Sequence, residues 1–305
     1  MDKSEGPLVS VLMTSYNREQ YIAEAIESVL ASTYTNFELI IVDDCSTDKT
    51  VSIAKKYERI DERVKVYVNQ KNLRQFGNRN KAANYANGKF LKYFDSDDVM
   101  YRDCLEVMVD AFKKNENAGA VSQTNDPLVN EKREPCLYSP QESYLNHFFR
   151  GNPILFSGPS GSMFKKEVFL ELGGFDENIG ILADTVLMLK IAAKYPFVGV
   201  RNNLLYWRRH DEQVTIGQAD WFEMIKQRFE INKNALNSKE FPLSNELKKI
   251  ISRNIKNVLI RRILMRLIKK GNFSEFFKLV KICDLRLTDF MLAIIKNKKF
   301  TSLPN

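Results

Sequence analysis

The chain has 305 residues, of which 44% are hydrophobic and 28% charged, and a formal net charge of +8. This composition is typical of a globular protein with one large domain, or one domain with an appendage, and no stretch reaches the roughly 18–20 apolar residues that span a bilayer. Four scattered cysteines and two histidines argue against a zinc cluster or a disulfide framework, so any metal should be a hard cation held by oxygen. The acidic, polar start lacks the basic region of a signal peptide, so we expect a cytoplasmic protein.

Apolar patterns of two different periods alternate through the first 125 residues. Short apolar or alternating runs predict strands at 9–15, 37–42, 63–69, 89–94 and 119–124. Apolar residues at helical spacing between them predict helices at 19–32, 48–59, 77–87 and 100–115. Strands separated by helices of this length indicate an α/β fold with a doubly wound, mostly parallel sheet, in which ligands bind beyond the carboxyl ends of the strands.

Polar clusters follow three of the predicted strands. They are "TSYNR" at 14–18, "DDCSTD" at 43–48 and "DSDD" at 95–98. Taken alone, the last cluster could simply begin a helix, because Ser and Asp are common helix caps. The carboxyl ends of parallel strands share one edge of the sheet, however, so the two acidic clusters should meet there. Repeated acid at one edge suits a divalent cation with bound phosphates, so the sequence favours a metal–nucleotide site.

The rest of the chain divides into an irregular middle and a basic, helical tail. Residues 126–217 are rich in Gly and Pro and contain a clear helical pattern at 183–195. Residues 218–305 hold 19 Lys and Arg against 8 Asp and Glu, a net charge of +11, whereas the remainder is net −3. The tail lacks the interleaved aromatic residues that stack on bases, so we expect no nucleic acid as a partner. Its basic segment 247–270 indicates contact with an anionic membrane surface, with a helical lid or a homo-oligomer contact as the alternatives.

Several ordered motifs between residues 7 and 215 resemble the family 2 glycosyltransferases, which have the GT-A nucleotide-sugar-binding fold. The stretches that carry the resemblance are "VSVLMTSYNREQYIAEAIESVL", "FELIIVDDCSTDKT", "NLRQFGNRNKAANYANGKFLKYFDSDD", "GGFDE", "ADTVLMLKIA" and "LLYWRRH". The resemblance implies a glycosyltransferase domain at 1–217, with a nucleotide-sugar-binding half at 1–125 and an acceptor half at 126–217. Residues 218–305 lie outside the resemblance, as a basic helical C-terminal region.

The resemblance also implies an activity. Members transfer a sugar from a nucleotide diphosphate, usually UDP, with inversion at the anomeric carbon, and Mn²⁺ or Mg²⁺ binds the diphosphate. We therefore expect an enzyme that uses a UDP-sugar donor and a saccharide or lipid-linked acceptor, in the synthesis of a surface polysaccharide or glycolipid. It would be cytoplasmic, with attachment to the inner face of the cell membrane through the tail.

Roles for individual residues follow from the resemblance, position by position. Asp184 falls at the position of the catalytic base, although it could also cap the helix that begins there, and Ala183 stands where the family commonly has a further acid. The metal ligands would be Asp97, Asp98 and His210. The residues expected to line the nucleotide are Thr14, Tyr16, Arg18, Asp43, Asp44, Arg74, Arg79 and Asp95. As alternatives, Asp44 could merely begin a turn, and Arg74 and Arg79 could be ordinary charges on a helix.

Two other functions fit parts of the pattern. A sugar nucleotidyltransferase also reads nucleotides on an α/β sheet, but it would need a glycine-rich phosphate loop after the first strand, and "TSYNR" contains no glycine. A non-catalytic nucleotide-sugar or carbohydrate-binding protein would not need the intact "DSDD" turn or a base at Asp184. A dinucleotide oxidoreductase is disfavoured because no GxGxxG follows the first strand.

Overall fold

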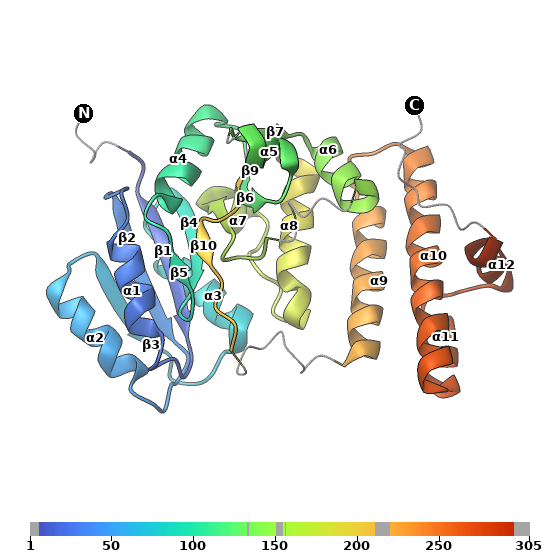
Figure 1. Ribbon diagram of the computed structural model, residues 1–305, viewed down its shortest axis with the longest axis horizontal. Coiled ribbons are helices and arrows are strands. Elements are labelled where there is room, and N and C mark those ends of the chain that lie inside the picture. The colour runs from blue at the N-terminus through green and yellow to red at the C-terminus, as the bar shows by residue number, and fades with distance from the viewer. Residues whose placement is uncertain (1–5, 133, 151–154, 156, 211–219, 296–305) are drawn as a thin grey trace. The chain divides into compact units, whose positions relative to one another are not determined.

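A mixed eight-stranded sheet organises the residues up to His210 in the computed structural model, which describes residues 6–132, 134–150, 155, 157–210 and 220–295 (Figure 1). The strands lie in the order β3-β2-β1-β4-β8-β6-β9-β7. Their bounds are β1 (Val9–Ser15), β2 (Phe37–Asp43), β3 (Val64–Val68), β4 (Phe90–Asp95), β6 (Ala120–Thr124), β7 (Cys136–Tyr138), β8 (Ser162–Lys165) and β9 (Phe197–Arg201). β7 and β8 run antiparallel to their neighbours and the other pairs are parallel, which confirms the predicted, mostly parallel sheet.

Helices cover both faces of this sheet. On one face, α1 (Ile22–Leu30), α2 (Thr50–Ile60) and α4 (Cys104–Lys114) share an apolar core with alternate residues of the strands. On the other face, α3 (Arg74–Tyr85) contacts β1 and β2. The aromatic rings that pack on this second face are Phe76, Tyr93, Phe164, Phe169 and Phe175. The doubly wound arrangement predicted from the alternating pattern is therefore present.

Shorter elements complete this part of the chain. They are the paired strands β5 (Val99–Met100) and β10 (Leu205–Tyr206), the helices α5 (Pro127–Lys132), α6 (Pro140–Leu145), α7 (Lys166–Glu171) and α8 (Ala183–Lys194), a π-helical turn at Asn146–Arg150 and a 3₁₀ turn at Gly180–Leu182. β5 directly follows the "DSDD" turn and pairs antiparallel with β10. This pairing places the residues that follow β10 next to the acidic turn.

The register of the parallel strands brings the polar clusters to one edge. Ser15 at the end of β1 pairs with Asp43 at the end of β2, and Thr14 pairs with Asp95 at the end of β4. The three clusters predicted to meet therefore follow strands that end side by side. The acids reach this position because each follows an apolar strand that is buried in the core.

The described residues from Asp220 onward, together with 148–150, form a second compact unit. Its helices are α9 (Trp221–Asn237), α10 (Asn245–Lys270), α11 (Phe273–Ile282) and α12 (Leu287–Ile295), which confirms the predicted helical extension. α10 begins at Ser244, whose side chain accepts the Leu247 N–H, and ends at Gly271 with φ of 64°. The predicted boundary at 217/218 lies within residues 211–219, outside the described residues, and stays a prediction. None of the described helices combines the length and the apolar character that crossing a bilayer requires.

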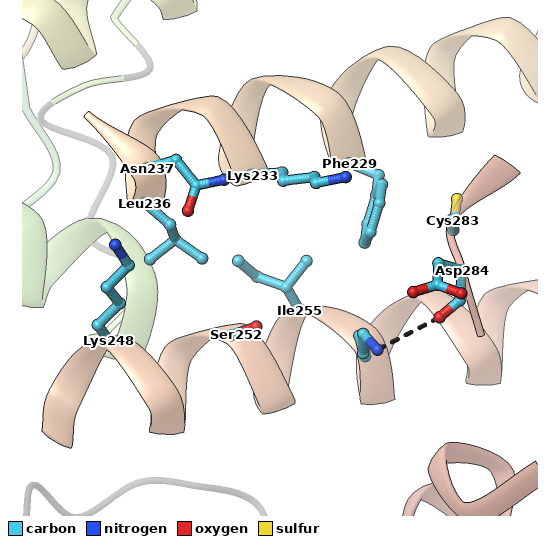
Figure 2. Close-up of a pocket in the computed structure, with 10 residues that line it drawn as sticks. Phe229, Lys233, Leu236, Asn237, Lys248, Ser252, Ile255, Cys283 and Asp284 are labelled. Carbon is cyan, nitrogen blue, oxygen red and sulfur yellow. Dashed lines mark hydrogen bonds between the residues drawn. The ribbon is translucent and has the colours of Figure 1, made fainter. Parts of the chain in front are cut away.

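A cavity of about 230 Å³ lies in this helical unit, lined by α9, α10 and the residues that follow α11 (Figure 2). Its apolar lining comes from Phe229, Leu236, Ile255 and Cys283, and its charged lining from Lys233, Lys248, Lys256 and Asp284. Lys256 donates to the Asp284 carbonyl oxygen (3.4 Å) and pairs with Asp289 (3.1 Å), so its charge is compensated inside the unit.

Candidate active site

Two adjacent buried aspartates follow β2 and have different surroundings. Asp43 accepts hydrogen bonds from the Ser46 N–H (2.8 Å) and the Ser46 hydroxyl (2.5 Å), so it is tied into the turn that follows the strand. Asp44 accepts through Oδ1 from Asn69 Nδ2 and from the Leu73 N–H, both at 2.8 Å. The Asp44 carboxylate is thus held in one orientation by the residue that follows β3 and by the residue that precedes α3.

The first carboxylate of the "DSDD" turn is fixed at both oxygens. Asp95 Oδ1 accepts from the Arg79 guanidinium (2.6 Å), and Oδ2 accepts from the Ser160 hydroxyl (2.6 Å). Burial acts to raise the pKa of Asp95, but the Arg79 charge and the two hydrogen bonds outweigh it and lower the pKa overall. Asp95 is therefore a charged group with a defined orientation at the carboxyl end of β4.

Two basic side chains meet at the second carboxylate of the turn. Asp97 Oδ2 lies 3.0 Å from Arg18 Nε and 3.1 Å from His210 Nε2, although His210 is 113 residues away in the sequence. The His210 ring stacks on Tyr21, with centroids 4.9 Å apart. Its Nδ1 is buried and has no hydrogen-bond partner among the described residues. The structure thus brings three of the predicted site residues into direct contact.

The third carboxylate carries an electrostatic penalty. Burial, together with the negative charges of Asp95 and Asp97, raises the pKa of Asp98 to about 7, while a hydrogen bond from the Arg208 N–H (3.0 Å) opposes the shift. A cation beside Asp97 and Asp98 would remove this repulsion. Across the described residues, no three or more His, Cys, Asp or Glu side chains are placed to hold a metal ion by themselves. The carboxylates and the His210 nitrogen fit a divalent cation whose shell includes oxygens of a bound diphosphate.

The predicted base lies at the start of α8. Asp184 is in the first turn of this helix, which begins after Leu182 without a side-chain cap, so the structure does not give Asp184 the capping role. Its Oδ1 accepts from the Thr185 N–H (2.6 Å). Burial raises the pKa of Asp184, and the Thr185 hydrogen bond and the charge of Arg79 partly oppose that increase. Arg79 therefore acts electrostatically on both Asp95 and Asp184.

The remaining predicted residues occupy the rim of the same edge or lie apart from it. The Thr14 carbonyl oxygen accepts from the Ser96 hydroxyl (3.0 Å), which ties β1 to the "DSDD" turn. Tyr16 follows β1 and is 48% exposed. Arg74 lies exposed at the first position of α3 with a positive φ of 64°. Within the described part of the chain, no hydrogen bond joins Arg74 to the acids, so its predicted nucleotide contact stays a prediction.

A comparison with protein families identifies the chain. Residues 10–173 match the family model of glycosyl transferase family 2, which is more than half of the chain. The chain belongs to glycosyl transferase family 2. The match covers the strand-end acids of this glycosyltransferase and ends before Asp184 and His210.

Known relatives include named glycosyltransferases. Chondroitin synthase of Escherichia coli is 30% identical over 224 residues, which cover 70% of this chain and 31% of that protein. The UDP-Glc:alpha-D-GlcNAc-diphosphoundecaprenol beta-1,3-glucosyltransferase WfgD of Escherichia coli is 42% identical over 108 residues, which cover 35% of this chain and 42% of that protein. The part that this family 2 glycosyltransferase matches is therefore less than half the length of either relative.

A solved structure supports the fold assignment. The structure of Staphylococcus aureus TarS 1-349 in complex with UDP-GlcNAc superimposes with a TM-score of 0.70 at 20% identity, over 94% of this chain and 81% of that one. The predicted GT-A-type fold is thereby confirmed.

Three residues at this candidate site were not predicted from the sequence. Arg208 donates from Nε to the Asp97 carbonyl oxygen (3.0 Å), in addition to its backbone bond to Asp98. Ser160 holds Asp95, and Lys92 lies buried within β4. Arg208 stands inside the quoted "LLYWRRH" stretch, and Lys92 is a lone charge in an apolar strand, so both had a signal in the sequence. Ser160 had none.

Proposed function

We propose that this family 2 glycosyltransferase moves a sugar from a UDP-sugar to a hydroxyl of a saccharide or lipid-linked acceptor, with inversion, in surface polysaccharide or glycolipid synthesis. The observation that carries the proposal is the convergence of Arg18 and His210 on Asp97 at the strand edge. The names of the relatives support it, since one is a glucosyltransferase that uses UDP-Glc and a diphosphoundecaprenol-linked sugar. The UDP-GlcNAc bound to TarS supports the same donor class.

On the donor side, Asp44 is proposed to read the base. Its Oδ1 already accepts from Asn69 and Leu73, which leaves Oδ2 to accept the N–H of uracil. The cations Arg18 and Arg79 would offset the charge of the diphosphate, with Thr14, Tyr16, Asp43, Arg74 and Asp95 as further proposed lining. Asp97, Asp98 and His210 would hold Mn²⁺ or Mg²⁺, which when bound would stabilise the charge that develops on the leaving diphosphate.

The chemical step assigned to this chain is a single displacement. Asp184 takes the proton of the acceptor hydroxyl, whose oxygen forms a bond to the anomeric carbon. The bond from that carbon to the diphosphate oxygen breaks at the same time, and its electron pair leaves with UDP. Since attack comes from the face opposite the leaving group, the configuration inverts. The raised pKa of Asp184 makes it a stronger base than an exposed aspartate.

A thermal-shift panel of nucleotide sugars tests the proposed donor. We expect UDP and one UDP-sugar to raise the unfolding temperature more in Mn²⁺ than in EDTA, because a ligand that binds the folded state at 100 times its Kd stabilises it by about 2.7 kcal/mol. GDP and CDP compounds should give smaller shifts, because the Asp44 carboxylate is proposed to accept a hydrogen bond from the N–H of uracil. Equal shifts with and without metal would refute the metal assignment.

Product analysis of the donor that gives the largest thermal shift separates the two alternative functions. A sugar nucleotidyltransferase would respond to a nucleoside triphosphate with a sugar phosphate and would release pyrophosphate. A non-catalytic binding protein would show the UDP-sugar shift without releasing UDP. Release of UDP from the donor, which both alternatives lack, is the outcome that we expect.

We also propose that the helical unit attaches to an anionic membrane surface. The net charge of +11 in residues 218–305 supports attachment, and so do large apolar side chains that lie exposed near basic ones. Ile268 is 84% and Phe273 62% exposed, on either side of the exposed Lys269 and Lys270. Arg261 and Arg266 are less suitable contacts, because Arg261 donates to the Ala293 carbonyl oxygen (3.3 Å) and Arg266 pairs with Glu275 (2.8 Å) inside the unit. A homo-oligomer stays a prediction.

Charge reversal at the end of α10 tests the membrane proposal. Lys269→Glu with Lys270→Glu should weaken sedimentation with anionic liposomes at least about tenfold, since each basic residue near such a surface contributes about 1 kcal/mol. Lys113→Glu with Lys114→Glu on the exposed side of α4 makes the same change in total charge and should have little effect. Wild-type protein that ignores anionic liposomes at low salt, where screening is weakest, would contradict the proposal.

A further inference from the structure

A lysine lies fully buried beneath the acidic strand edge. Lys92 is in the middle of β4 and is 0% exposed. Because alternate residues of a strand share a face, its side chain starts on the side of the sheet where Phe90 and Phe94 join the apolar core. The Nζ donates to the backbone carbonyl oxygens of Tyr93 and Ser160.

This position is costly for an ammonium group. Burial lowers the pKa of Lys92, and the nearby Cys104, Asp95 and Asp98 oppose that shift. A methionine of similar length would fill the same space without the desolvation cost. Packing alone therefore does not account for a lysine here, whereas its hydrogen bonds connect it to the proposed donor site.

The hydrogen bonds form a chain that ends at the "DSDD" turn. Lys92 donates to the Ser160 carbonyl oxygen, and the Ser160 hydroxyl donates to Asp95 Oδ2 (2.6 Å). Arg79 holds the other oxygen of the same carboxylate (2.6 Å). The orientation of Asp95 thus depends on two hydrogen-bond donors, Arg79 and Ser160, and Ser160 lies in the loop before β8.

That loop is itself closely held. Ser160 is 4% exposed, and the next residue, Gly161, accepts the Gln123 N–H of β6 (2.9 Å). A side chain at Gly161 would collide with the Ser157 carbonyl oxygen. Lys92 therefore anchors the loop from the β4 side while Gln123 anchors it from the β6 side, and the loop has little freedom to place Ser160 elsewhere.

We propose that Lys92 is a positioning residue for donor binding: it anchors the loop that carries Ser160, so that Ser160 fixes the orientation of Asp95 in the proposed nucleotide site. The inference rests on the proposed function, since it assumes that UDP binds at this edge. Lys92 itself does not touch the donor. Its contribution passes through Ser160, which makes the two residues one unit.

A double-mutant cycle on UDP affinity tests this proposal. Calorimetric titration in Mn²⁺ should show that Lys92→Met and Ser160→Ala each weaken UDP binding about tenfold, which is the usual scale for losing a hydrogen bond to a charged group. The double variant should be no weaker than the single variants, because both remove the same support. Lys89→Met, which removes an exposed lysine at the start of the same segment, is the matched control and should bind UDP like the wild type.

The outcomes distinguish this role from others. Wild-type UDP affinity in Lys92→Met would overturn the proposal, and so would a double variant weakened about a hundredfold, which would mean that Lys92 acts independently of Ser160. A purely structural lysine would change the unfolding temperature and leave UDP affinity unchanged. If Lys92→Met does not fold, Ser160→Ala decides, and unchanged affinity there refutes the proposal. A wild type that binds no UDP would refute the proposed function and this inference together. Wild-type binding with unchanged affinity in the variants would refute this inference alone.

Discussion

Replacing Asp184 by asparagine is expected to lower kcat by about 10²–10⁴-fold, the usual contribution of a general base. Asparagine keeps the size of the side chain but cannot take the proton of the acceptor hydroxyl. UDP affinity should stay close to that of the wild type, because the strand-end acids and not Asp184 are proposed to hold the donor. Turnover measured as UDP release, beside calorimetric UDP binding, separates the two effects. A variant with near-normal kcat would remove Asp184 from the mechanism.

The pH dependence of the wild type gives a second measurement on the same residue. Burial raises the pKa of Asp184, so the carboxylate gains its proton at a higher pH than an ordinary aspartate would. A base must be deprotonated to act, and kcat/KM reports the pKa of the free enzyme, so kcat/KM should fall as the pH drops through this raised value. The acidic limb should therefore lie above the usual aspartate range near 3.9. It should be absent from the residual activity of Asp184→Asn.

Asp97→Asn should have the second largest effect. The substitution removes the charge on which Arg18 and His210 converge, and with it one proposed ligand of the metal. We expect kcat/KM to fall about 10²–10³-fold, the range found when one group that stabilises developing charge is lost. UDP binding should also become the same in Mn²⁺ and in EDTA.

Asp110→Asn is the matched control for that variant. Asp110 lies exposed on α4, where it pairs with Lys113 and not with a residue of the acidic turn, and its replacement makes the same change in charge. It should leave both kcat/KM and the Mn²⁺ dependence unchanged. Retention of the metal dependence in Asp97→Asn would show that the "DSDD" turn does not hold the cation.

The strand edge could be predicted from the sequence because it depends on local patterns. Buried strands are recognised in the sequence as apolar runs. The runs of β1, β2 and β4 are each followed by a polar cluster, and the parallel sheet places these clusters side by side. In the structure Ser15 pairs with Asp43 and Thr14 with Asp95, which places the clusters at one edge as predicted. The periodicity of 183–195 similarly predicted α8, with Asp184 in its first turn.

Contacts between distant segments could not be read from periodicity. His210 meets Asp97 across 113 residues, and its place in the site came from the family resemblance alone. Ser160 reaches Asp95 from a loop without any regular pattern. In the tail, Arg266 belongs to the basic segment 247–270 that was predicted to contact a membrane. It pairs with Glu275, because helix–helix packing decides which charges are engaged.

The configuration of the first sugar released to water tests the proposed displacement most directly. The protein is incubated in Mn²⁺ with the α-linked UDP-sugar that stabilises it most, and proton NMR follows the free sugar before mutarotation. Water replaces the acceptor, and Asp184 takes its proton, so no acceptor needs to be known. We predict that the β-anomer forms first and that Asp184→Asn slows its release. Initial formation of the α-anomer would contradict a single displacement at this site.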